Sequence, residues 1–217
     1  MIDGVAVTVS PEAVIVSADR LLTVISSAIA GGGITRARAI VNLHVHKDMP
    51  WQDADLTVDT FVRRYAVAGP VVGLLTAAAT EKAETTMESG ADLSALVIAT
   101  VGLSNVIDAG ASVRAAPSPS TINTIVVLDA DPEPAALVNV VMTVTEVKTA
   151  VLAAAGLRCA DGRAASGTST DAVAVAATGR GVRCRFGGPV SDLGWVVACA
   201  ARRALEAGVH RWMQEHP

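Results

Sequence analysis

The segment PAALVNVVMTVTEVKTAVLAAA (residues 134–155) constrains most strongly what this chain can fold into. It predicts one long helix, with Pro134 in the first turn and Gly156 as its stop. With about 100° between successive residues, Leu137 and Val141 mark one apolar side, and further Val and Met residues fill the flanks. A helix that is apolar nearly all round is buried, so the rest of the chain must cover it.

Polar side chains interrupt this predicted helix. Asn139, Thr143 and Glu146 lie opposite the apolar side, whereas Lys148 falls among apolar residues and must reach water or find a partner. A buried carboxylate is paired or titrates abnormally, so Glu146 is a candidate general acid or base. The alternative is a polar stripe along one wet edge of the helix. Since these side chains break the apolar run, a membrane span of about 20 apolar residues is not predicted.

Short strand-like runs surround the helix, and the first two form a predicted hairpin. They are residues 4–9, 13–18, 21–33, 36–45, 71–79, 95–103 and 121–130. Further helices are predicted from about residue 53 to 68 and from 191 to 213. Because strands and helices do not alternate regularly, we predict an α/β or α+β fold, a single domain over residues 1–217 with mixed β-sheets flanked by helices. With 51% hydrophobic but only 3% aromatic residues, the core must consist mainly of Val, Ala, Leu and Ile.

The charge pattern argues against nucleic acid as a partner. The formal net charge is -4, and Lys and Arg form no block longer than a pair, whereas a phosphate-binding surface needs clustered cations. Three cysteines without CxxC spacing indicate neither a disulfide framework nor a zinc knuckle. Without a signal peptide at its start, the chain is expected to be cytoplasmic. The sequence does not decide between a monomer and a homo-oligomer.

The stretch NLHVHKDMP (residues 42–50) raises the question of a metal site. His44 and His46 are one residue apart and would point the same way on a strand, as in some metal-dependent hydrolases. A third ligand is required, and the remaining histidines, His210 and His216, fall on the C-terminal helix and tail. Metal-assisted hydrolysis by His44 and His46 is therefore an alternative, and no metal is expected in the main interpretation.

The stretch GTSTD (residues 167–171) offers three hydroxyl groups and a carboxylate just before an alternating strand. On an extended strand, Ser169 and Asp171 would face one way and Thr168 and Thr170 the other. A junction of this kind can present a nucleophile or bind a polar ligand. It can equally be a turn whose side chains bind their own backbone.

The order of several short segments resembles the adenosylcobinamide amidohydrolase family over about residues 5–208. These segments are SSAIAGGG, ARAIVNLHVHKD, VGLLTAA, ATVGL, TINTIVVL, ALVNVVMTVTEVK, GTSTDAVAV and FGGPVSDLGW. Each is weak alone, and the specificity lies in their order. The resemblance implies cleavage of the amide that joins the corrin side chain to 1-amino-2-propanol, in corrinoid salvage. The partner is then a corrinoid substrate, which carries the cobalt itself, and no cofactor is implied.

The resemblance also places the polar positions of the family on this chain. For catalysis, we expect Glu146 or Asp171 to activate water or the hydroxyl of Thr168 or Thr170, with Lys148 orienting the carboxylate. The expected substrate-binding residues are Ser27, Gly32, Gly33 (with Gly31), Asn42, His44, Asn123, Asn139, Gly187 and Gly188. Backbone amides of the glycine runs, or Asn42 and Asn123, would stabilise the oxyanion. A corrinoid-binding protein without hydrolytic activity is the alternative from another class.

Overall fold

The strands of the chain join into one large mixed sheet. The computed structural model describes residues 1–114 and 120–216. Its main strands are β1 (Val5–Val9), β2 (Ala13–Ser26), β3 (Gly33–His44), β4 (Val71–Thr76), β5 (Glu84–Gly90), β6 (Leu93–Val101), β8 (Ile122–Asp129) and β11 (Ala172–Ala177). They are ordered β4-β3-β2-β11-β8-β6-β5, with β1 paired to β2. The pairs β3–β4 and β8–β11 are parallel and the others antiparallel, which confirms the predicted mixed α/β class.

Three α-helices and several short elements complete the described part of the chain. The helices are α1 (Ala54–Arg64), α2 (Pro134–Ala154) and α3 (Asp192–Glu215), and two 3-10 turns are η1 (Trp51–Asp53) and η2 (Thr80–Lys82). Two small ladders pair β7 (Val106–Ile107) with β10 (Gly167–Thr168), and β9 (Asp131–Pro132) with β12 (Arg183–Cys184). The helix boundaries lie within a few residues of the predicted ones.

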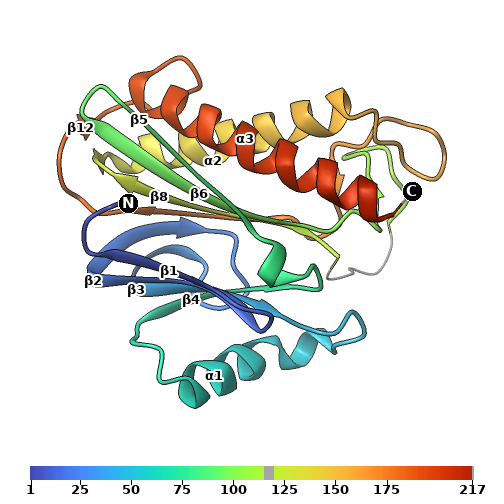
Figure 1. The fold of residues 1–217 in the computed structure, drawn as a ribbon, viewed down its shortest axis with the longest axis horizontal. Coiled ribbons are helices and arrows are strands. Elements are labelled where there is room, and N and C mark those ends of the chain that lie inside the picture. The colour runs from blue at the N-terminus through green and yellow to red at the C-terminus, as the bar shows by residue number, and fades with distance from the viewer. Residues whose placement is uncertain (115–119, 217) are drawn as a thin grey trace.

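The sheet folds over on itself and forms two facing layers (Figure 1). The bend lies in the long β2–β3 hairpin, whose register shifts between Ser17 and Leu22. Side chains of both layers share one core, in which Val14, Ile40 and Leu74 of one layer meet Ile98 and Ile125 of the other. Helix α1 covers the outer face of the β3–β4 layer, and α2 and α3 cover the outer face of the β6–β8 layer. The order is helix, sheet, sheet, helices.

Helix α2 is less buried than its sequence predicts. Its inner side packs on the sheet and on α3, but Val138 and Met142 are 45% and 53% exposed. Thr143 is buried and Glu146 is exposed, so of the two interpretations of Glu146 the buried carboxylate is wrong and the exposed polar edge agrees with the structure. The reason is that α2 lies in the outermost layer, where only one side has neighbours. By length and composition alone, α2 is long and apolar enough to cross a membrane, with a mean hydropathy of 1.5 over an 18-residue stretch. Of that stretch, 44% is buried inside the protein.

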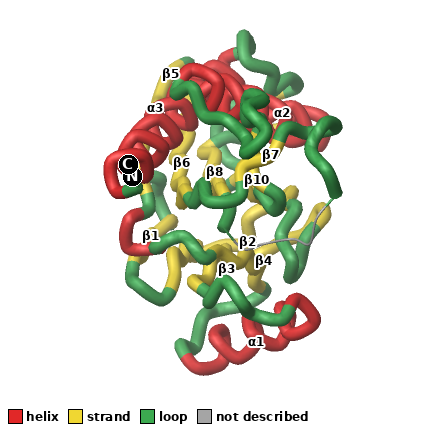
Figure 2. Tube along the Cα trace, turned by 90° about the vertical axis from the view of Figure 1, so that its right-hand side faces the viewer, coloured by secondary structure: helices red, strands yellow, loops and turns green. Residues whose placement is uncertain are grey.

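The polar strand ends gather at one end of the molecule. Figure 2 looks onto this end and shows the strands of both layers between α2 and α3 on one side and α1 on the other. The carboxyl end of β3 and the amino ends of β8 and β11 meet here, because β8 pairs with β11 in parallel and the fold-over returns β3 to the same end. The β7–β10 ladder lies beside these strand ends, next to α2.

Candidate active site

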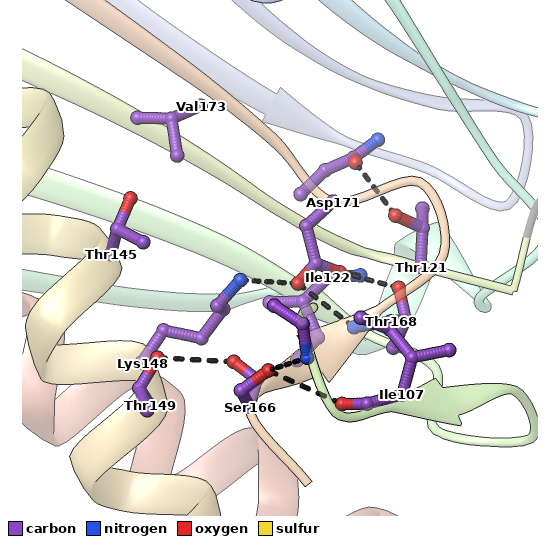
Figure 3. Close-up of polar contacts among 12 residues, drawn as sticks. Ile107, Thr121, Ile122, Thr145, Lys148, Thr149, Ser166, Thr168, Asp171 and Val173 are labelled. Atoms are coloured by element: carbon purple, nitrogen blue, oxygen red, sulfur yellow. Dashed lines mark hydrogen bonds and ion pairs between the residues drawn. The ribbon is translucent and has the colours of Figure 1, made fainter. Parts of the chain in front are cut away.

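Asp171 is the centre of a compact polar cluster. After β10 ends at Thr168 the chain turns, so the Asp171 side chain folds back toward Thr168 instead of alternating with it as an extended strand would. Oδ1 of Asp171 accepts hydrogen bonds from the Thr168 hydroxyl and from the Ile122 N–H, the latter at 3.0 Å. Oδ2 accepts from the Thr168 N–H, also at 3.0 Å, and from Lys148 Nζ. Four donors therefore fix this carboxylate (Figure 3).

Lys148 reaches this cluster from α2 and forms an ion pair with Asp171 (Figure 3). The two side chains are only 13% and 11% exposed. The sequence indicated that Lys148 must reach water or find a partner, and the structure shows that it pairs with Asp171. Removing one member of a buried ion pair typically costs about 3–5 kcal/mol, because the other charge is left uncompensated.

Gly167 leaves the space in which this ion pair forms. A Cβ atom at this position would lie 2.5 Å from Asp171 Oδ2 and 2.8 Å from Lys148 Nζ. Both distances are shorter than a van der Waals contact, so any larger residue would push the two charged groups aside. The glycine of the GTSTD motif thus has a steric role at the site.

A second polar cluster lies between the two sheet layers. Asn123 Nδ2 of β8 donates to Asn42 Oδ1 of β3 at 2.8 Å and to the Leu75 carbonyl at 2.9 Å, and Asn42 Nδ2 donates to Thr100 Oγ1 at 2.9 Å. Asn42 and Asn123 are 2% and 1% exposed. Both amide hydrogens of Asn123 are therefore used within the protein. The hydroxyl of Thr121 donates to Asn123 Oδ1 at 3.4 Å.

The two histidines of NLHVHKDMP line a cavity of about 490 Å³ beside this second cluster. His44, the last residue of β3, has its Nδ1 3.0 Å from the Ala78 carbonyl, and His46 Nδ1 lies 3.3 Å from Asp48 Oδ2. Within residues 1–114 and 120–216, no group of three or more His, Cys, Asp or Glu side chains is placed to hold a metal ion. The described residues thus offer His44 and His46 no third ligand of these types.

Of the remaining predicted residues, some lie at the same end of the sheet as the two clusters and others do not. Ser27 extends the pairing of β2 with β11, since its N–H donates to the Val173 carbonyl and its hydroxyl accepts from the Val173 N–H, both at 3.1 Å. Gly32 lies against the Ala28 backbone and Gly33 begins β3, at the same end of the sheet. Thr170 lies in the turn between Thr168 and Asp171.

The structure separates Gly187, Gly188 and Asn139 from these residues. A Cβ at Gly187 would touch the carbonyl of Ala136, in the first turn of α2. Ala136 precedes Lys148 by twelve residues, or about 18 Å along the helix axis. Asn139 belongs to the same part of α2, so these three residues do not join the Asp171 cluster in this conformation.

Sequence reasoning missed several participants in these clusters. Thr100, Thr121 and the backbone amide of Ile122 were not predicted. Thr100 and the Ile122 amide act through contacts between distant segments, whereas Thr121 binds Asn123, two residues along the chain. The only signal for two of them is their position at a strand end within TINTIVVL and ATVGL, where a polar residue interrupts or ends an apolar run. Trp212, which lines the cavity from α3, carried no signal that separates it from a core residue.

Comparison with known proteins adds a family to this geometry. All 217 residues match the family model described as adenosylcobinamide amidohydrolase. No curated protein gives a match. Among solved structures, a beta-aminopeptidase of Burkholderia sp. is 15% identical with a TM-score of 0.46, covering 93% of this chain and 78% of that chain. The PH0078 protein from Pyrococcus horikoshii OT3 is 10% identical with a TM-score of 0.45, covering 95% and 83%.

Proposed function

The chain belongs to the adenosylcobinamide amidohydrolase family, and from this premise we propose that it hydrolyses the amide bond of adenosylcobinamide. The products are adenosylcobyric acid and (R)-1-aminopropan-2-ol, and the reaction serves cytoplasmic corrinoid salvage. The family supports a hydrolase that acts on an amide bond, and its description supports our choice of adenosylcobinamide as the substrate. The corrinoid is the partner, and its cobalt is cargo of the substrate.

The observation that carries the catalytic part of the proposal is the hydrogen bond from the Thr168 hydroxyl to Asp171. A general base must lie within hydrogen-bond reach of the proton that it takes, and Asp171 meets this condition for Thr168. Lys148 holds the carboxylate in place from the opposite side. Glu146, exposed on the outer face of α2, has no part in this step.

In the proposed reaction, the Thr168 oxygen attacks the carbonyl carbon of the substrate amide while its proton passes to Asp171. The C–N bond then breaks, and the proton moves from Asp171 to the departing amine nitrogen. This leaves an ester between Thr168 and the corrin carboxyl group. Water hydrolyses the ester, releases the carboxylic acid and restores the Thr168 hydroxyl. Atoms and charge balance without an added metal or organic cofactor.

Substitution of the base tests this assignment. Asp171→Asn keeps the shape of the side chain but removes the proton acceptor, so kcat for release of the amino alcohol from adenosylcobinamide should fall by about 10²- to 10⁴-fold. Thr168→Val should behave likewise and Thr168→Ser should retain activity. Glu146→Gln is the matched control and should leave kcat unchanged. A kcat near the wild-type value in Asp171→Asn would refute the role of Asp171.

Two further measurements decide the alternatives. A protein that binds adenosylcobinamide but releases no amino alcohol would be a corrinoid-binding protein without hydrolytic activity. Activity that disappears after chelation and returns with a divalent metal would support metal-assisted hydrolysis at His44 and His46. We expect turnover to survive chelation, because the proposed step uses the Asp171 carboxylate as proton acceptor and the Thr168 hydroxyl as nucleophile, and these two groups are in direct contact.

A further inference from the structure

The cavity of about 490 Å³ is not explained by the Asp171 cluster. It lies at the same end of the molecule, where its wall includes His44, Ser104, Ser120 and Trp212. Ser120 is two residues before Ile122, whose N–H binds Asp171, so the cavity and the proposed base are linked through the short segment that leads into β8. A substrate larger than the cavity could therefore place one part in it and another part at Asp171.

The volume of the cavity indicates which part of the substrate can fit into it. Small-molecule sites typically have volumes of about 300–1,000 Å³, so a cavity of this size is a complete site for a compact ligand. A corrin macrocycle with its amide side chains is too large for it. A nucleoside, which is one ring system with one sugar, is of suitable size.

The aromatic wall indicates a flat ring. Trp212 and His216, one turn apart at the end of α3, are stacked with ring centroids 4.3 Å apart and planes within 10°. Both residues line the cavity. Nucleobases commonly stack on the faces of aromatic side chains, because every base has a π face.

The charges of the cavity favour an uncharged ligand over a free phosphate. Lys82 is paired with Glu215 at 2.7 Å, and Arg211 forms an ion pair with Glu84, so two of the three Lys and Arg residues in the wall are already compensated. Lys47 is the third. The site therefore lacks the concentration of free positive charge that a phosphate group requires.

Neutral polar groups in the wall suit a sugar and a base edge. The hydroxyl of Ser104 donates to Ser120 Oγ at 2.7 Å, which leaves Ser120 able to donate to a ligand. His44 is held through Nδ1 at the Ala78 carbonyl, so its other ring nitrogen remains for a ligand. We infer that this cavity binds the adenosyl nucleoside of the substrate, with the base on the Trp212–His216 stack, an inference that rests on the proposed function.

The test compares substrates with and without the adenosyl group in two variants. Trp212→Ala should raise KM for adenosylcobinamide by at least about tenfold with little change in kcat, since it removes the stacking platform but not the proposed base. The same substitution should leave KM unchanged for cobinamide without the adenosyl group. Trp195→Ala, on the same helix and 54% exposed, is the control and should change neither value.

Direct binding separates this inference from the proposed function. Calorimetry with 5′-deoxyadenosine should show binding to the wild-type protein and at least about tenfold weaker binding to Trp212→Ala, whether or not the amide is hydrolysed. Absence of 5′-deoxyadenosine binding, or an equal effect of Trp212→Ala on both cobinamides, would overturn the inference. Binding of inorganic phosphate in its place would also overturn it. Nucleoside binding without release of amino alcohol would overturn only the proposed function.

Discussion

At the scale of single residues, Gly167 offers the most direct test of the Asp171–Lys148 pair. Its backbone is not in the left-handed region, so alanine is acceptable to the main chain, and only the added Cβ crowds the two charged groups. We expect Gly167→Ala to lower kcat at least about tenfold and the free energy of unfolding by about 1–3 kcal/mol. Steady-state kinetics and urea denaturation measure these changes.

The control for this prediction is Gly90→Ala. A Cβ at Gly90 would meet Val196 Cγ2 at an ordinary 3.6 Å, far from the candidate site. Normal activity is expected in this variant. If Gly167→Ala also kept normal kcat, the position of Lys148 against Asp171 would not matter for turnover.

The sequence predicted the residues of this cluster better than their pairing. Lys148 on an apolar helix side had to reach water or find a partner, and GTSTD was predicted either to serve chemistry or to form a turn that binds its own backbone. The bond from the Thr168 N–H to Asp171 is of the second kind. The choice between Glu146 and Asp171 needed the tertiary structure. Because α2 has apolar residues nearly all round, its pattern did not decide between a buried Glu146 and a polar stripe along a wet edge, and the structure shows Glu146 exposed and Thr143 buried.

At the scale of elements, the contact between α1 and β4 is set by a glycine. A Cβ at Gly73 would lie 2.6 Å from Val58 Cγ1 and 3.2 Å from Ala30 Cβ. Overpacking of this kind costs about 1–3 kcal/mol, so Gly73→Ala should lower the free energy of unfolding by that amount. Val58→Ala removes the obstructing methyl groups and should lower stability on its own.

The double variant shows whether the two substitutions affect the same packing contact or destabilise the protein independently. In Gly73→Ala with Val58→Ala, the new methyl group partly fills the space that Val58 leaves. The loss should therefore be smaller than the two single losses together, with a coupling of about 0.5–3 kcal/mol. Chemical denaturation of all four proteins measures it, and strictly additive losses would contradict the packing described for α1.

Most elements were predictable because apolar runs with turn residues mark them. Strand β5 was missed because its sequence, ETTMESG, is polar and lies at the edge of the sheet, where one neighbouring strand suffices. Strand β2 was predicted as two separate apolar runs, residues 13–18 and 21–33, so the single bent strand and the fold-over were not predicted. A bend within a hairpin leaves little trace in periodicity, so the meeting of Asn42 with Asn123 could be known only from the structure.

At the scale of the whole molecule, the β2–β3 hairpin makes the two sheet layers dependent on each other. The first half of β2 pairs with β1, and the second half of β2 pairs with β11. Side chains of both layers share one core. Neither layer can open without exposing the core of the other. We therefore expect the two halves of β2, residues 13–17 and 23–26, to exchange amide hydrogens at similar rates, through global unfolding.

Helix α1 supplies the internal comparison for this experiment. It is held to its sheet layer through three buried residues, Ala54, Val58 and Phe61, and no second helix of the described residues covers it. Its amides should exchange faster than those of β2, by local opening that leaves the two-layer core intact. Hydrogen exchange followed by peptide mass spectrometry resolves these segments. If one half of β2 exchanged as fast as α1, the layers would open separately, and the hairpin would join two independent units rather than one core.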